Sequence, residues 1–158
     1  MSGLQIVVQW LHVLGGIFWF GSSLYAASVF APTLMSLPPQ VAGPVFAASV
    51  KRTAVVLETV GGMTILLGVI RGTLFGPVQS FSFLFGTTYG ITWAVALLLG
   101  LGILGWSHFV VAPAGNQAAA MLAVGDIAGM RRGLWRILVE MVGFFGIFTC
   151  MILMRFGL

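Results

Sequence analysis

The chain has 158 residues, of which 59% are hydrophobic and 6% are charged, and its formal net charge is +4. Apolar enrichment of this degree excludes an ordinary soluble domain. A single cysteine excludes a disulfide framework and a paired-cysteine metal site. Because the basic residues lie beside the apolar runs, we interpret the positive charge as a topology signal and expect no nucleic-acid partner.

Four apolar runs follow one another along the chain, and each is long enough to cross a bilayer, which needs about 20 mainly apolar residues. The runs cover residues 4–30, 53–75, 88–111 and 134–154. They take up most of the sequence and leave little room for a soluble domain. We therefore predict an all-α integral membrane protein, an antiparallel four-helix transmembrane bundle that forms one domain over residues 1–158 and is surrounded by membrane lipid.

The connections between these runs carry helix breakers and short helical patterns. Proline lacks a backbone donor and disfavours helix at the residue before it. The first span is therefore predicted to end near Ala31, which precedes Pro32. Short surface helices are expected at residues 43–50 and 118–123, in the first and third connections.

The distribution of Lys and Arg predicts the orientation, because these residues gather on the cytoplasmic side of membrane proteins. Arg71 and Arg155 lie on one side of the predicted bundle. The other five lie in or beside the first and third connections: Lys51, Arg52, Arg131, Arg132 and Arg136. Those connections should face the cytoplasm, and both termini should lie outside.

The first span carries His12, one of only two histidines in the chain. From the helix rise, this residue lies roughly 12 Å below the outer face. An ionisable side chain at such a depth is a functional-site hypothesis by default. The alternative is a core histidine that hydrogen-bonds to its neighbours.

Met63 of the second span should lie within a few ångströms of the depth of His12. Imidazole and thioether together can ligate a haem iron. The glycine pairs at 15–16 and 61–62 would leave space for the macrocycle. The alternatives are close helix packing at the glycines and a packing role for Met63.

A second group of ionisable residues belongs to the cytoplasmic third of the bundle. Glu58 is about 8 Å into the second span and Glu140 about 9 Å into the fourth, while His108 and Arg136 lie nearer the surface. A carboxylate alone in lipid is costly, so we expect these groups to face one another. They could form a proton relay or a site for a propionate or metal, or a structural network in which Arg136 neutralises Glu140 at i,i+4. His12 and His108 lie something like 15 Å apart along the membrane normal, too far to share one haem iron.

Residues 10–21, WLHVLGGIFWFG, resemble the first span of small bacterial four-helix membrane proteins. Two related families share this opening: the J-type, haem-containing protoporphyrinogen IX oxidases and the CopD-like copper-resistance membrane proteins. Residues 136–141, RILVEM, are similar to the Arg-x-x-Asn-Glu-Pro motif of the oxidases, and His108 matches their late histidine. The oxidases also carry a lysine near the start of the third span, where this chain has residues 93–95, WAV.

The resemblance implies a protein of the bacterial cytoplasmic membrane that binds haem b through His12 as the iron ligand. We expect electron transfer with a quinone or a porphyrinogen, with Met63 as second ligand. The candidate catalytic residues, which would handle protons or anchor propionates, are His108, Glu58, Glu140 and Arg136. The chain is expected to be a homo-oligomer or a subunit of a larger membrane complex. The alternatives are a cofactor-free accessory subunit and a copper-handling membrane protein.

Overall fold

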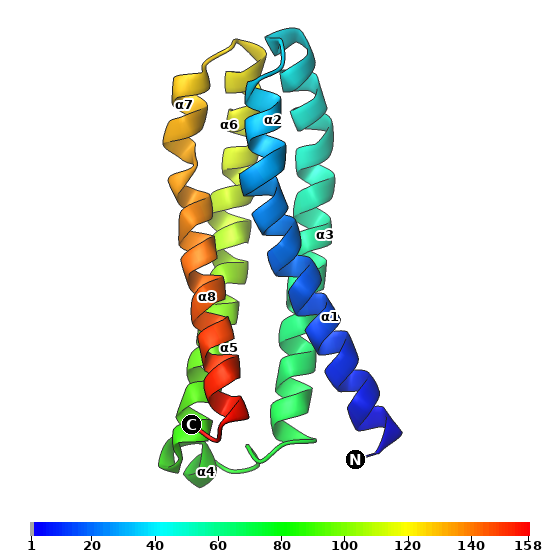
Figure 1. Ribbon diagram of the computed structural model, residues 1–158, viewed down its shortest axis with the longest axis vertical. Coiled ribbons are helices and arrows are strands. Elements are labelled where there is room, and N and C mark those ends of the chain that lie inside the picture. The colour runs from blue at the N-terminus through cyan, green and yellow to red at the C-terminus, as the bar shows by residue number, and fades with distance from the viewer. Residues whose placement is uncertain (1) are drawn as a thin grey trace.

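The computed structural model describes residues 2–158, and all the regular secondary structure in this range is helical (Figure 1). The elements are, in chain order, α1 (Gly3–Tyr25), the π-helical turn η1 (Ala26–Phe30), α2 (Ala31–Met35), α3 (Pro39–Thr73), α4 (Phe81–Gly86), α5 (Thr88–Trp106), the π-helical turn η2 (Ser107–Val111), α6 (Ala112–Ala123), α7 (Ile127–Gly133) and α8 (Trp135–Arg155).

These elements join into four long helices, Gly3–Met35, Pro39–Thr73, Thr88–Ala123 and Ile127–Arg155, each long and apolar enough to cross a membrane. Figure 1 places both termini and α4 at one end of the molecule, which we call the terminal end. The α2–α3 and α6–α7 turns lie at the other end, which we call the hairpin end. Helix α1 packs mainly on α3, and α5 packs mainly on α8. The prediction of four long apolar helices is confirmed.

Side-chain caps fix where several helices begin. The Ser2 hydroxyl accepts from the backbone N–H of Gln5, and the Gln5 side chain accepts from the backbone N–H of Ser2, which makes a capping box for α1. Thr87 caps α5 through the N–H of Gly90, at 3.0 Å. Asp126 caps α7. Each cap satisfies a backbone donor that has no partner within its helix.

The first long helix does not end near Ala31, so that prediction is wrong. The π-helical turn η1 precedes Ala31, whose N–H donates to the carbonyl of Ala26, and α2 then continues past Pro32 to Met35. A π-turn adds one residue to the hydrogen-bond ladder, so the helix can continue through a proline without a sharp break.

The third long helix repeats this device. The N–H of Ala112 donates to the carbonyl of Ser107 across η2, and Pro113 follows in α6. The helices expected at 43–50 and 118–123 exist, but they are continuous with α3 and α6 rather than separate. The long helices are therefore longer than the apolar runs that predicted them.

Two clusters of buried side chains hold the bundle together. The middle of the bundle is packed around Trp19, Ile103, Met141 and Phe144. The rings of Trp19 and Phe144 meet edge to face, with centroids 5.0 Å apart. Trp19 also lies against Gly61, where a Cβ atom would approach it to 2.8 Å, so α1 and α3 approach closely because this position is glycine.

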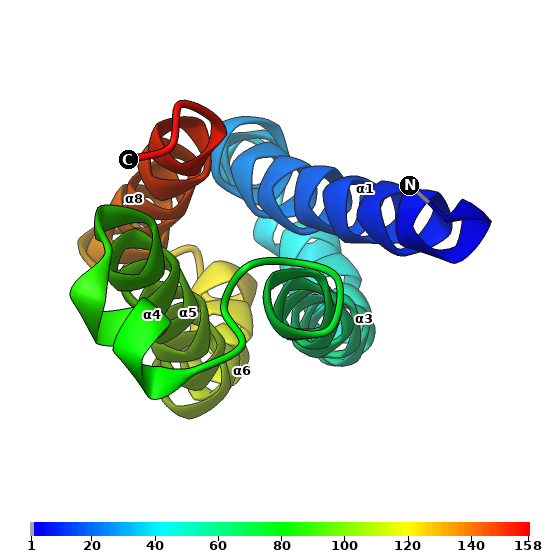
Figure 2. The ribbon, with the colours of Figure 1, turned by 90° about the horizontal axis from the view of Figure 1, so that it is seen from below.

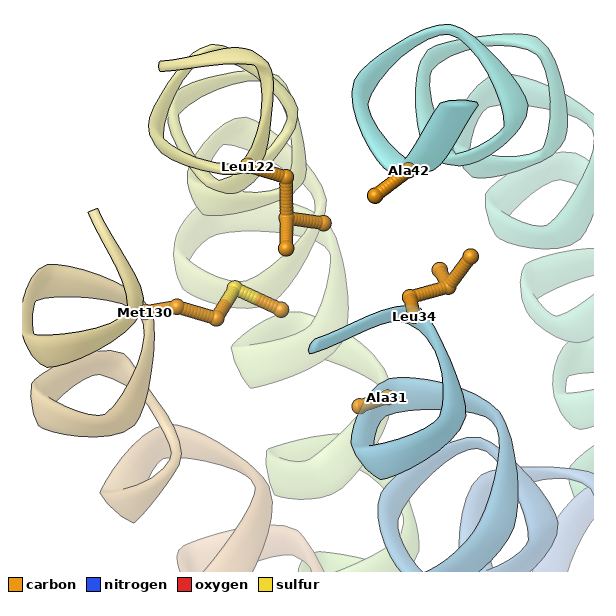
Figure 3. Packing of buried hydrophobic residues seen from close by; sticks show 5 residues of the cluster. All are labelled: Ala31, Leu34, Ala42, Leu122 and Met130. Atoms are coloured by element: carbon orange, nitrogen blue, oxygen red, sulfur yellow. The ribbon is translucent and has the colours of Figure 1, made fainter. Parts of the chain in front are cut away.

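The second cluster lies at the hairpin end and is drawn in Figure 3. It consists of Ala31, Leu34, Ala42, Leu122 and Met130, contributed by α2, α3, α6 and α7. Leu122 is fully buried at its centre. The hairpin end therefore has a core of its own.

Candidate functional site

A cavity of about 550 Å³ opens at the terminal end, between α1, α3, α5 and α8. Figure 2 views the molecule from this end and shows these four helices. We call it the terminal-end cavity. Its polar lining residues are Gln9, His12, Thr64, Arg71, Tyr89 and Arg155. Its apolar lining includes Trp93, Phe144, Phe148, Met151 and Met154, and glycines at 16, 68, 72 and 100.

His12 lies in the wall of this cavity with a defined orientation. Its Nδ1 is 2.9 Å from the backbone carbonyl oxygen of Thr64. A carbonyl oxygen can only accept, so Nδ1 must donate, and the lone pair of the neutral ring then lies on Nε2. Within residues 2–158 no buried side-chain nitrogen or oxygen lacks a partner, so Nε2, which forms no hydrogen bond with the chain, must be accessible. A hydrogen bond of this kind satisfies a core histidine, the alternative given above, and it would equally orient a metal-ligating histidine through its other ring nitrogen.

Glycines on α3 make room for this arrangement. A Cβ atom at Gly68 would lie 2.9 Å from Cε1 of His12, so any larger residue would push the ring off α3. One turn further on, the indole of Trp93 packs against Gly72.

Of the glycine pairs predicted to leave space for a macrocycle, Gly15 packs against Thr64 and Gly61 against Trp19, whereas Gly16 lines the cavity. A cofactor beside these glycines stays a prediction.

Two arginines line the same cavity. Nε of Arg71 donates to the side-chain oxygen of Gln9 at 2.9 Å, and Nη1 donates to the carbonyl of Phe75 at 3.2 Å. Arg71 is therefore held in position with further N–H groups to offer. Arg155, at the end of α8, is exposed. The cavity thus combines a neutral imidazole with two cations that can bind carboxylates.

Met63 is not brought to His12. Its side chain is 53% exposed, on the outside of the bundle, and it does not line the terminal-end cavity. Equal depth does not make two residues neighbours, because Met63 points away from the face of α3 that carries Thr64 and Gly68. The thioethers that do line the cavity come from α8, at Met151 and Met154.

A second cavity, of about 200 Å³, lies toward the hairpin end, and we call it the hairpin-end cavity. Glu58, Arg136 and Glu140 line it, as predicted for residues that should share one region. Glu140 is buried and accepts a hydrogen bond from the hydroxyl of Ser107. These residues do not line the cavity that holds His12, so the structure separates them from any ligand bound there.

His108 forms an ion-pair contact with Glu58, with Nδ1 3.0 Å from Oε2, and its side chain is 57% exposed. Arg136 and Glu140 are not within ion-pair distance of each other in the described part of the chain, which contradicts the alternative in which Arg136 neutralises Glu140 directly. The Arg136 guanidinium lies over the ring of Trp135 instead, and its backbone carbonyl accepts from the Trp106 indole. Among the four residues expected to face one another, the one ion pair or hydrogen bond in the described part of the chain is therefore that of His108 with Glu58.

Ligand sets for a bare metal ion are absent from residues 2–158, where no three His, Cys, Asp or Glu side chains gather. Sequence reasoning missed Thr64, Arg71, Arg155 and Met151 as members of the site. Arg71 and Arg155 were interpreted only as orientation signals. Both arginines lie at the predicted membrane face nearest to His12, and this shared position was the feature of the sequence that could have indicated their membership of the site.

Comparisons with protein-family models, curated proteins and solved structures find no match to this chain.

Proposed function

We propose that this protein is a b-type haem protein of the bacterial cytoplasmic membrane with an electron-transfer role, in which His12 ligates the iron. The observation that carries the proposal is His12 itself: Nδ1 is fixed by the Thr64 carbonyl and Nε2 is accessible beside a cavity of about 550 Å³. A volume in the range of about 300–1,000 Å³ is typical of sites for organic ligands.

The charges support a transmembrane position for the bundle. On α3, Arg52 and Arg71 are 19 residues apart, about 28 Å of helix, and the same spacing separates Arg136 and Arg155 on α8. The hydrocarbon core of a bilayer is about 30 Å thick. We propose that the four helices cross it antiparallel, with the hairpin end in the cytoplasm and both termini outside. The terminal-end cavity then lies in the outer half of the membrane.

The residues of the terminal-end cavity fit a haem better than a bare ion. The macrocycle supplies most ligands of a haem iron, so one histidine is sufficient, whereas a copper site of protein ligands needs several. No three His, Cys, Asp or Glu side chains gather in the part of the chain that the structure describes, and the soft ligands that line the cavity with His12 are the thioethers of Met151 and Met154. Arg71 and Arg155 would hold the propionates, and Trp93 and Phe148 would cover the ring.

When bound, a haem supplies one-electron chemistry through its iron. The protein's own contribution would be to orient the ligating imidazole and to shield the haem from solvent. Thr64 fixes the tautomer of His12 and so the direction of its lone pair. The partner that exchanges electrons is proposed to be a quinone or a porphyrinogen, as the resemblance to the oxidases implies.

The experiment is an absorption spectrum of the protein purified in detergent after expression with haem available. We expect a Soret band that is lost in His12→Ala. His108→Ala is the matched control, because it removes the other histidine, which is exposed and lines neither cavity, and it should leave the band unchanged. A colourless, folded protein that copurifies with a larger complex would instead support the accessory-subunit alternative.

A further inference from the structure

The hairpin-end cavity is built between two π-helical turns. Ala26 and Phe30 of η1 and Ser107 and Val111 of η2 all line it. π-helical turns are rare, well under 1% of residues, and are frequent at functional sites. Two of them around one cavity of about 200 Å³ indicate a site that the chain has shaped.

Glu140 lines this cavity and has one carboxyl oxygen without a hydrogen-bond partner among the described residues. Its residue is 6% exposed, and Oε1 accepts from the Ser107 hydroxyl. No Lys, Arg or His of the described residues lies within ion-pair distance of it, and Oε2 forms no hydrogen bond with the chain. Because no fully buried polar side-chain atom in residues 2–158 lacks a partner, Oε2 must be accessible, and the cavity is the space that Glu140 lines. An oxygen in this position can accept a hydrogen bond from a ligand or from water.

Size and lining restrict what that ligand can be. A cavity of about 150 Å³ in another protein accommodates benzene, so about 200 Å³ suits a single substituted ring. The walls are mainly apolar, and Phe30 and Phe46 stack at one side with centroids 6.2 Å apart. A sugar or an amino acid would leave many polar groups without partners there. A bare metal ion would find no group of three ligands.

The position of the cavity indicates how the ligand arrives. Glu140 lies four residues, about 6 Å of helix, inside Arg136, which marks the proposed cytoplasmic border of the membrane. The cavity also reaches Phe46 and Met130 of the hairpin end beyond that border. A lipid-soluble molecule whose polar ring lies near the headgroups would meet this cavity at the correct depth.

We propose that the hairpin-end cavity binds the ring of a membrane quinol, with one ring hydroxyl donating to Oε2 of Glu140. The quinol ring would pack against the apolar side chains that line the cavity, and the Ser107 hydroxyl orients the Glu140 carboxyl group through its hydrogen bond. This site is distinct from the proposed haem site, because no residue lines both cavities. This site deepens the proposed function, because it rests on the quinone partner proposed there and gives that partner a place in the fold, but quinol binding does not need haem to be bound.

The test is calorimetric titration of the detergent-solubilised protein with a tail-less dimethoxy-methyl benzoquinol and, separately, with its oxidised benzoquinone. Wild type should bind the quinol more tightly than the quinone, because a carboxylate accepts hydrogen bonds and does not donate them. Glu140→Gln keeps an oxygen for Ser107 but offers an NH₂ group to the cavity. We expect the Kd for the quinol to rise about 10-fold in this variant, because one charge-assisted hydrogen bond typically contributes that much to affinity. The variant should also lose the preference for the quinol over the quinone.

Two further variants make the result decisive. Ala54→Leu should weaken both ligands by filling the cavity, since Ala54 lines it. His12→Ala should bind the quinol as wild type does, even if it loses haem, so the two proposals can fail separately. The inference is overturned if folded wild type binds neither compound, if Glu140→Gln binds both as wild type does, or if His12→Ala abolishes quinol binding.

Discussion

Replacing Gly68 by alanine should displace the His12 ring without removing any proposed ligand of the haem iron. The added Cβ would lie 2.9 Å from Cε1 and 3.4 Å from Nδ1 of His12. Carbon atoms pack at about 3.5–4.0 Å, so the ring must retreat from α3 by about 0.5 Å or more. The Thr64 carbonyl lies on the same helix, so the Nδ1···O distance would lengthen from 2.9 Å to about 3.4 Å, outside the usual range.

The expected loss follows from what that hydrogen bond contributes. Removing an outer partner of a metal-ligating histidine typically costs about 10–100-fold in affinity. We expect the haem Kd of Gly68→Ala to rise about 10-fold, measured by titrating haem into the apo-protein and following the Soret band. Gly62→Ala is the matched control, because a Cβ there meets nothing within 4 Å, and it should bind as wild type does. Equal affinities of the two variants would refute the assigned position of His12 at the haem.

The remaining predictions concern the rest of the terminal-end cavity. Arg71→Gln should weaken haem about 10-fold and the more exposed Arg155→Gln about 2–5-fold, and both should bind haem dimethyl ester as wild type does, since the ester has no carboxylates. An equal loss with the ester would exclude a role in propionate binding. Met151→Trp should lower haem affinity about 10-fold by filling the cavity, whereas Met63→Trp, on the exposed side of α3, should not change it. Similar titration curves for these two variants would contradict the assignment of the cavity.

The sequence predicted the number and approximate limits of the long helices, because a run of apolar residues is a strong signal. It did not predict how far they extend. Pro32 and Pro113 normally indicate a helix end, but a π-helical turn precedes each of them and the helix continues. A wider turn depends on packing around it, which the local sequence does not report.

Within the candidate site, the depth of His12 and the grouping of Glu58, Arg136 and Glu140 followed from the helix rise alone. The helix rise does not tell which face of a helix points toward the interior of the bundle. Met63 has a suitable depth and the wrong direction, because the rotation of α3 is set by its contacts with α1 through Gly61 and Gly68. The Ser107 contact of Glu140 was also hidden, since it depends on the π-helical turn that begins at Ser107.

Imidazole rescue tests most directly whether His12 ligates a haem iron. His12→Gly leaves a space at the cavity wall without altering Thr64 or the two arginines. The Soret band and haem binding should be lost in this variant and should return when imidazole is added to the solution. A Soret band in His12→Gly identical to that of wild type, with no response to imidazole, would contradict it.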